Sequence, residues 1–413
     1  MGDRVPVETH AARVRELLAP LFARGTERVP LIDALDRVTA VAVISPIDLP
    51  PFRNSQMDGF AVRAADVLVV KDGDRERPSQ PESAPGITLP IAREVAAAPG
   101  DAGSLQPGTA IRIMTGAPVP EGADAVIPVE DTQVNGGDVT ILRSRVAGDY
   151  VREAGSDLHA GDTIFPAATR LASRHLAALA ASGLTEVEVV TRVSVAVVST
   201  GSELVEPGTA LGPGQIPDSN GIALGAAVRA AGAELVAAGR VFDDPATLAA
   251  LFDQVIAETD VDLFLTSGGI SMGDHEVVRE LLEPLGAEVG TVNMQPGGPQ
   301  ALATYAGVPV VCFPGNPVSS QLSFELFVAP LLRELAGLPA TVLERHFLQH
   351  SITSIPGRRQ YLRGRRLPEN RVETVAGPGS HLVAALAASD VLIVIPDDAV
   401  ELAAGESVET LPL

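Results

Sequence analysis

The spacing of apolar residues divides the 413-residue chain into contrasting regions. Apolar residues recur at helical spacing within residues 7–22 and Gly25 follows them, so the sequence predicts an opening helix there. A second short helix is predicted around residues 31–38. From residue 45 to about residue 146, short apolar alternations are punctuated by proline and glycine, which is typical of strands joined by turns.

A regular alternation of apolar runs and helical segments begins after a further predicted helix at residues 170–183. A continuous β-branched run predicts a strand at residues 193–199, and further strands are predicted at residues 234–241, 261–266 and 308–313. The segments between and after them predict helices at residues 220–231, 245–257, 276–282 and 317–336. Strand, loop and helix in this order predict a parallel sheet with helices on both faces. After Gly337 the pattern becomes short and strand-like to the end of the chain.

Composition and charge narrow the classes of function. The formal net charge is −22 and Lys71 is the single lysine, which argues against nucleic acid and against anionic membrane surfaces as partners. The single cysteine, Cys312, cannot form an intramolecular disulfide and is predicted to be a small core residue. No apolar run is long enough to span a bilayer and the first twenty residues do not resemble a signal peptide, so we expect a soluble cytoplasmic protein.

The candidate chemistry lies in the loops that follow the predicted strands. Ligands of open α/β sheets bind beyond the carboxyl ends of the strands. Glycine-rich turns at residues 267–269 and 314–317 precede helices, where exposed backbone N–H groups can hold phosphate. Carboxylates on neighbouring loops, such as Glu203 and Asp243, can hold Mg²⁺. The sequence therefore predicts a metal-assisted site for a phosphorylated ligand at this edge.

Several of these residues also have structural interpretations. Asp243 or Asp244 before Pro245 is a favourable helix N-cap, and Asp218 is as good a cap as a ligand. Glu203 could be a solvated side chain. Residues 314–317 could form only a rigid turn, whereas the two adjacent glycines after Ser267 favour a functional loop.

One motif indicates a different chemistry. Residues 269–273 satisfy G-x-S-x-G, the nucleophile elbow of α/β-hydrolases, which would make Ser271 a nucleophile. However, an elbow places serine at the tip of the strand, and four residues intervene here. The downstream histidines that could complete a triad are His346, His350 and His381, and they lie outside the α/β pattern.

Seven motifs follow one another at residues 50–61, 112–126, 152–157, 199–204, 218–220, 267–274 and 314–319. The first reads PPFRNSQMDGFA, the second contains MTGAPVP, and the last two read SGGISMGD and PGNPVS. In this order they resemble the motifs of molybdopterin molybdenumtransferases, the family that includes MoeA and the gephyrin E domain. The resemblance covers nearly the whole chain.

This resemblance implies insertion of molybdenum from molybdate into adenylylated molybdopterin, with release of AMP. It also implies Mg²⁺ and an elongated homodimer, whose active site lies between the α/β domain of one subunit and the β-rich domain of its partner. The implied fold is multidomain, with a central three-layer α/β domain of mostly parallel sheet, a β-rich second domain and a C-terminal β-barrel-like domain. The domains expected are residues 1–44 with 146–176, 45–145, 177–335 and 336–413.

Matching to the family motifs assigns expected roles to individual residues. Catalytic roles are implied for Asp58, Thr115, Asp157, Glu203 and Asp243. Substrate binding is implied for Ser267, Gly268, Gly269, Ser271, Asp218, Pro314, Gly315, Asn316, Pro317 and Ser319. The implied metal ligands are Glu203, Asp243, Asp274 and Glu276, the last standing where the family usually has aspartate.

The chain also departs from the family pattern. Thr291, Gln295 and Gly298 stand where many members carry lysines, which lowers the cationic charge available to an anion. These departures leave a second hypothesis, a gephyrin-like scaffold that binds a peptide of a membrane receptor or cytoskeletal partner. The one basic cluster is predicted to be solvated or to face another subunit, and it consists of Arg358, Arg359, Arg363, Arg365 and Arg366.

Overall fold

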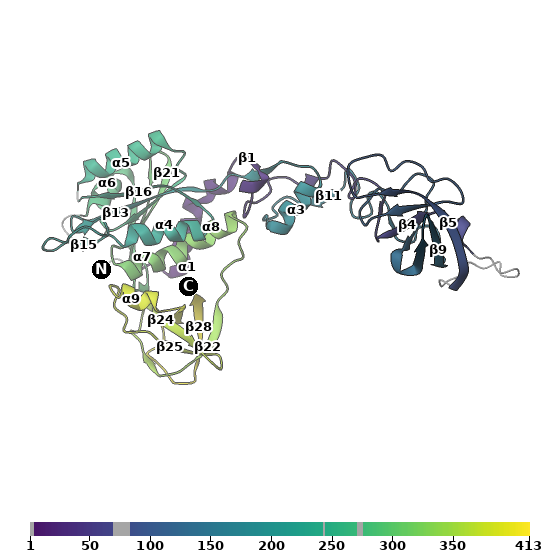
Figure 1. Cartoon of the computed structure of the whole chain (residues 1–413). Helices are drawn as coiled ribbons and strands as arrows, with labels where there is room; N and C mark the ends of the chain where they lie inside the picture. Colours follow the sequence, from purple (N-terminus) through teal and green to yellow (C-terminus); the bar gives the residue numbers. More distant parts are fainter. Residues whose placement is uncertain (1–3, 69–82, 243, 271–275) are drawn as a thin grey trace.

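The computed structural model describes residues 4–68, 83–242, 244–270 and 276–413. The molecule is elongated, with a β-rich lobe at one end and an α/β unit packed on a barrel at the other (Figure 1). A slender middle part joins the two ends and contains β1 (Thr26–Pro30), β11 (Thr163–Phe165) and α3 (Ser173–Ala181). Segments from residues 26–44 and 163–190 pair with each other in this middle part, so the chain passes through it twice.

The α/β unit is built on a six-stranded sheet. In spatial order its strands are β16 (Glu234–Val241), β13 (Ser194–Thr200), β17 (Leu263–Ser267), β21 (Val308–Phe313), β20 (Pro299–Tyr305) and β18 (Glu288–Thr291). The first four are parallel, and the last two add an antiparallel extension. The predicted parallel sheet is confirmed, whereas its antiparallel edge was not predicted.

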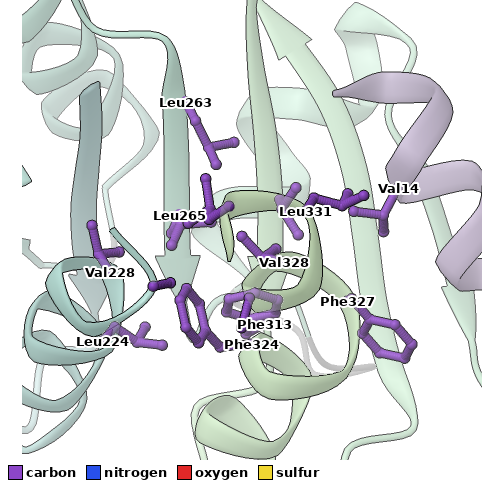
Figure 2. Close-up of a cluster of buried hydrophobic side chains, with 14 of the residues drawn as sticks. Val14, Leu224, Val228, Leu263, Leu265, Phe313, Phe324, Phe327, Val328 and Leu331 are labelled. Atoms are coloured by element: carbon purple, nitrogen blue, oxygen red, sulfur yellow. The ribbon is translucent and has the colours of Figure 1, made fainter. Parts of the chain in front are cut away.

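Helices cover both faces of this sheet. One face packs α4 (Asn220–Ala230), α7 (Pro317–Ser323), α8 (Ala329–Leu335) and α1 (Val7–Leu17), as Figure 2 shows for the core between them. The other face packs α5 (Pro245–Glu258) and α6 (Val277–Leu282). Alternate residues of β13 enter the two cores: Val197 enters the first and Val198 the second. The expected three-layer architecture is confirmed, and Cys312 is fully buried in the second core.

The β-rich lobe contains a second six-stranded sheet. Its order is β7 (Ala125–Pro128), β4 (Gly59–Val62), β6 (Ala110–Ile113), β5 (Ser83–Val95), β9 (Asp138–Arg143) and β8 (Thr132–Asn135). Phe60 and Ile127 pack on one face and Ala61 and Ile111 on the other. This lobe confirms the β-rich domain that the alternating pattern predicted.

The C-terminal part forms a closed five-stranded barrel. Its strands are β24 (Arg359–Leu367), β25 (Arg371–Thr374), β22 (Glu344–Leu348), β28 (Ser407–Pro412) and β26 (Val391–Ile395), and β26 closes the ring on β24. The short strand β19 (Met294–Gln295) pairs with β24 and ties the barrel to the α/β unit.

Two predicted helices differ from the observed elements. The segment predicted as a helix at residues 31–38 contains only the 3₁₀ turn η2 (Leu31–Asp33), and Asp36 has a positive φ of 62° that no helix accepts. The helix predicted at residues 317–336 is interrupted by a π-helical turn, η5 (Phe324–Val328). In the part of the chain that the structure describes, no helix is long and apolar enough to cross a membrane.

Candidate functional site

A cavity of about 750 Å³ opens at the carboxyl edge of the parallel sheet. The loops that leave β13, β17 and β21 form most of its wall, as expected for an open α/β sheet. Most of the predicted site residues line it, namely Glu203, Asp218, Ser267, Gly268, Gly269, Glu276, Pro314, Gly315, Asn316, Pro317 and Ser319. The alternation of strands and helices therefore predicted that a ligand cavity would lie at this edge of the sheet.

The two glycine-rich loops meet at van der Waals distance. Gly268 has a φ of +98°, and a Cβ there would lie 2.5 Å from the carbonyl oxygen of Thr200. A Cβ on Gly315 would lie 3.4 Å from the Cα of Gly268. Only glycine allows the loop after β17 to pass between its two neighbours at this distance, so Gly268 has a packing role, and the functional interpretation of residues 267–269 stays a prediction.

A buried amide links these two loops. Asn220 is 7% exposed, and its Nδ2 donates to the Oγ of Ser267 at 2.7 Å and to the carbonyl oxygen of Gly315 at 2.8 Å. Both hydrogens of the amide are therefore used within the cavity wall. Our residue assignment missed this role, although Asn220 belongs to the motif at residues 218–220.

The capping interpretation is confirmed for Asp244, whereas the N-cap residue of α4 is Ser219 and Asp218 stands one residue before it. The Oδ1 of Asp218 accepts the backbone N–H groups of Asn220 and Gly221 at 3.0 and 3.1 Å, at the start of α4. Asp244 caps α5, and the hydroxyl and backbone N–H of Thr247 lower the pKa of the Asp244 carboxyl. Three predicted residues, Ser271, Asp243 and Asp274, lie outside the described residues.

The described wall of the cavity is acidic. Glu203, Asp218 and Glu276 line it, and none of the described lining residues is lysine or arginine. His381 is the basic side chain of this described set. Among the residues that the structure describes, no group of three or more His, Cys, Asp or Glu side chains could hold a metal ion.

Two predicted catalytic residues form a pair in the β-rich lobe. The Oδ1 of Asp58 accepts the backbone N–H of Thr115 at 2.7 Å and its hydroxyl at 2.8 Å. These two hydrogen bonds lower the pKa of the Asp58 carboxyl. The pair adjoins β4 and β6, at the end of the molecule opposite the cavity (Figure 1). Asp157 is also absent from the cavity wall and donates its backbone N–H to the carbonyl of Leu49 at 2.9 Å.

The cavity has lining residues that our sequence analysis did not assign to the site. Thr200 ends β13, and Gly297 and Pro299 flank one of the positions that lack the family lysine. Ser380 and His381 come from the C-terminal part, from the loop between β25 and α9 (Val383–Ala387). The glycines at positions 377 and 379 mark that loop in the sequence, but no local pattern reveals that the barrel packs against this cavity.

The positions without lysine make structural contacts. The Oε1 of Gln295 accepts the Nε2 of Gln360 at 2.7 Å, between β19 and β24. A Cβ on Gly298 would lie 3.3 Å from the methyl group of Thr291. Gln295 therefore links β19 to β24, and none of the three positions adds a cation beside the cavity.

Comparisons with known proteins agree with this architecture. Residues 5–183 match the family described as MoeA N-terminal region (domain I and II), residues 196–334 match a probable molybdopterin binding domain, and residues 347–413 match MoeA C-terminal region (domain IV). Molybdopterin molybdenumtransferase 2 of Mycobacterium tuberculosis is 42% identical, with 93% of this chain and 94% of the relative covered. Molybdopterin molybdenumtransferase of Nostoc sp. is 39% identical, with 76% and 70% covered.

A solved structure shares the fold over the full length. The molybdopterin biosynthesis MoeA protein from Pyrococcus horikoshii is 32% identical, and its TM-score is 0.79 with 99% of each chain covered. The likeness therefore includes the β-rich lobe and the barrel as well as the α/β unit. With matches along nearly its whole length, the chain belongs to the MoeA family of molybdopterin molybdenumtransferases.

Proposed function

We propose that this protein inserts molybdenum from molybdate into adenylylated molybdopterin and releases AMP. The observation that carries the proposal is the 750 Å³ cavity in the segment that matches a probable molybdopterin binding domain. Glycine-rich loops before helices are a common type of phosphate site, although the N–H groups of Gly268 and Val318 are bonded within the protein here. The acidic wall suits a metal-bound phosphate better than a bare anion. Its volume is that of a site for a drug-sized ligand.

The test is direct. Purified protein is mixed with adenylylated molybdopterin, molybdate and Mg²⁺, and AMP is measured by chromatography. We expect AMP in amounts that match the cofactor formed, and no cofactor when molybdate is left out. A folded protein that binds the substrate and never forms cofactor would refute the proposal.

Glu203 and Glu276 are the described carboxylates that would hold Mg²⁺, with Asp243 and Asp274 as further predicted ligands. Two carboxylates suit this ion, because Mg²⁺ usually binds one or two of them and completes its shell with water and substrate phosphates. When bound, Mg²⁺ would neutralise charge on the phosphates. The chain's part is to place these carboxylates in the same cavity wall as the glycine-rich loops.

The magnesium assignment is tested by titration after removal of divalent ions with EDTA. We expect Glu276→Gln to need more Mg²⁺ for half-maximal AMP release. Glu16→Gln, an exposed carboxylate on α1, is the matched control and should behave as wild type. Identical Mg²⁺ dependence of all three proteins would remove Glu276 from the metal site.

We also propose a homodimer in which Asp58 and Thr115 of one subunit complete the cavity of the other. Their position at the opposite end of the molecule requires a second subunit if they act at this cavity. The middle part offers exposed apolar side chains for such a contact, namely Ile32, Leu35, Val41 and Ile44. The exposed fraction of Ile32 is 87%, which is large for an isoleucine of a monomer.

Subunit mixing distinguishes the two arrangements. Asp58→Ala and Glu203→Ala chains carrying different tags are co-expressed, and the mixed dimer is isolated. If each active site is shared between subunits, one of the two sites in the mixed dimer is intact, so about half of the wild-type activity returns. A mixed dimer as inactive as both parents would show that Asp58 and Glu203 do not act from different subunits.

The alternative functions are not favoured. The relatives that match along this chain carry the transferase name, so the gephyrin-like scaffold has no observation in its support. For the hydrolase, His346 is 6% exposed and its Nδ1 lies 2.8 Å from the Oγ1 of Thr410 within the barrel. His381, another of the candidate histidines, does line the cavity, but β17 ends at Ser267 and not at Ser271, as a nucleophile elbow would require. Ser271 is therefore proposed as a ligand contact and not as a nucleophile.

A further inference from the structure

The arginines of the C-terminal basic cluster have different surroundings. Arg359 pairs with Glu8, Arg365 with Glu373 and Arg366 with Glu344. Arg363 differs, because it is 2% exposed and no described carboxylate lies within ion-pair distance of it. The prediction that this cluster is solvated or faces a subunit is therefore wrong for Arg363.

The buried guanidinium of Arg363 holds a single loop. Its Nη1 donates to the carbonyl oxygen of Gly379 at 3.0 Å, and its Nη2 donates to the carbonyl oxygen of Gly377. Hydrogen bonds from a charged donor are about twice as strong as those between neutral groups, and burial strengthens them further. The rigid fork of the guanidinium also fixes the two carbonyls relative to each other.

This loop continues directly into the cavity wall. The carbonyl oxygen of Ser380 accepts the backbone N–H of Val318 at 3.1 Å, in the first turn of α7. Ser380 and His381 then line the cavity. The His381 ring packs on Gly379, where a Cβ would lie 3.0 Å from its Cε1 atom. Arg363 thus holds the loop from the barrel side, and Val318 holds it from the α/β side.

We infer that Arg363 is a positioning residue, which acts through residues 377–381 to place Ser380 and His381 against the ligand in the cavity. This inference rests on the proposed function for the identity of the ligand. His381 supplies an imidazole to a described wall that otherwise carries carboxylates and neutral groups. In the described wall, the basic side chain that can contact an anionic ligand therefore comes from the barrel. Its position depends on the loop that Arg363 holds.

The first arm of the test needs no ligand. Hydrogen exchange of residues 376–383 is compared in wild type, Arg363→Lys, Arg363→Met and Arg365→Met. Arg365 lies on the same strand and pairs with Glu373, so Arg365→Met is the matched control. We expect faster exchange in both Arg363 variants and no change in the control. The Lys variant keeps a charge and guards against failure of the Met variant to fold. Unchanged exchange in a folded Arg363 variant would overturn the inference.

The second arm measures binding of adenylylated molybdopterin by calorimetry, without molybdate. We expect Arg363→Met and His381→Ala each to weaken binding about tenfold, close to the value of one hydrogen bond to a charged group. The double variant should bind the ligand no more weakly than the weaker-binding single variant does, because both changes remove the same contact with the ligand. Unchanged affinity, or effects that multiply, would overturn the inference.

The two arms separate this inference from the proposed function. If wild type does not bind adenylylated molybdopterin, the proposed function fails, and the hydrogen exchange arm still decides whether Arg363 holds the loop. If wild type binds and forms cofactor while Arg363→Met binds equally well, the function stands and the positioning role fails.

Discussion

Replacing Asn220 with alanine tests the physical basis of the cavity. The side chain joins the loop after β17 to the loop after β21 through one donor group, its Nδ2. Alanine fits the same helical position in α4 without strain, so the change removes the link and little else. We therefore expect the two glycine-rich loops to separate while the sheet below them remains intact.

The magnitude follows from the surroundings of the two acceptors. Each lost hydrogen bond is worth about 1 kcal/mol net, and a buried group left without a partner adds about 1–3 kcal/mol. Ser267 is 1% exposed, and its hydroxyl still donates to the carbonyl oxygen of Pro314 at 3.4 Å. Gly315 is exposed, so water can replace the amide at its carbonyl. The expected loss is therefore about 2–3 kcal/mol, near the lower end of the range.

The assay combines urea unfolding followed by circular dichroism with hydrogen exchange of residues 266–270 and 313–317. Circular dichroism is preferred because the chain has no tryptophan. Asn135→Ala in the β-rich lobe, an exposed asparagine, is the matched control. If Asn220→Ala is as stable as the control, and its loops exchange no faster, the amide does not hold the cavity together and the argument is refuted.

Three further predictions concern burial and backbone conformation. Burial lowers the pKa of His10 to about 4, so the folded state binds a proton at His10 less readily than the unfolded state does. The free energy of unfolding should therefore fall by up to about 3 kcal/mol as the pH falls from 6.5 towards 4. Urea unfolding at pH 7.5 and 4.5 checks this, since His10→Gln should lose less stability on acidification, and an equal loss would contradict it. Gly268→Ala should cost more stability than Gly286→Ala, because both glycines have a positive φ but only at Gly268 would a Cβ contact Thr200. Equal losses of about 1–3 kcal/mol in thermal unfolding would mean that backbone strain alone matters. Burial raises the pKa of Cys312 to about 12, so a thiol reagent should label the protein only in denaturant, and rapid labelling of the folded protein would show that the second core opens.

The sequence predicted best the elements whose pattern is local. The strands at residues 234–241 and 308–313 were predicted at their observed bounds. The second is a compact apolar run that ends at Pro314. The segment at residues 31–38 failed because its apolar spacing resembles a helix, while the positive φ of Asp36 ends the turn. The antiparallel strands β18 and β20 escaped prediction because their pairing is with each other and with β21, which no local spacing reports.

The sequence likewise predicted the site residues that follow the strands of the sheet, but not those that other domains bring to the cavity. The predicted parallel sheet placed Ser267, Gly315 and Glu203 at one edge because the carboxyl ends of parallel strands lie together, and all three line the cavity. His381 could not be found in this way, since its place depends on how a separate barrel packs on α7. Asp58 and Thr115 came from family resemblance, and their pairing with each other is visible only in three dimensions.

No described residue that lines the cavity is a lysine, and near the cavity Gln295 makes a contact that a lysine could not make. A lysine there could donate to Gln360 but could not also accept, whereas the Gln295 oxygen accepts the Nε2 of Gln360, whose own oxygen accepts the Ser354 hydroxyl at 2.8 Å. This chain of neutral hydrogen bonds connects β19 to the barrel beside Gly297, a residue of the cavity wall. Gln295 therefore adds a contact between the α/β unit and the barrel at a position where the family resemblance implies a lysine. The same barrel supplies His381, so in this protein the attachment of the barrel and the basic character of the described cavity wall depend on one interface.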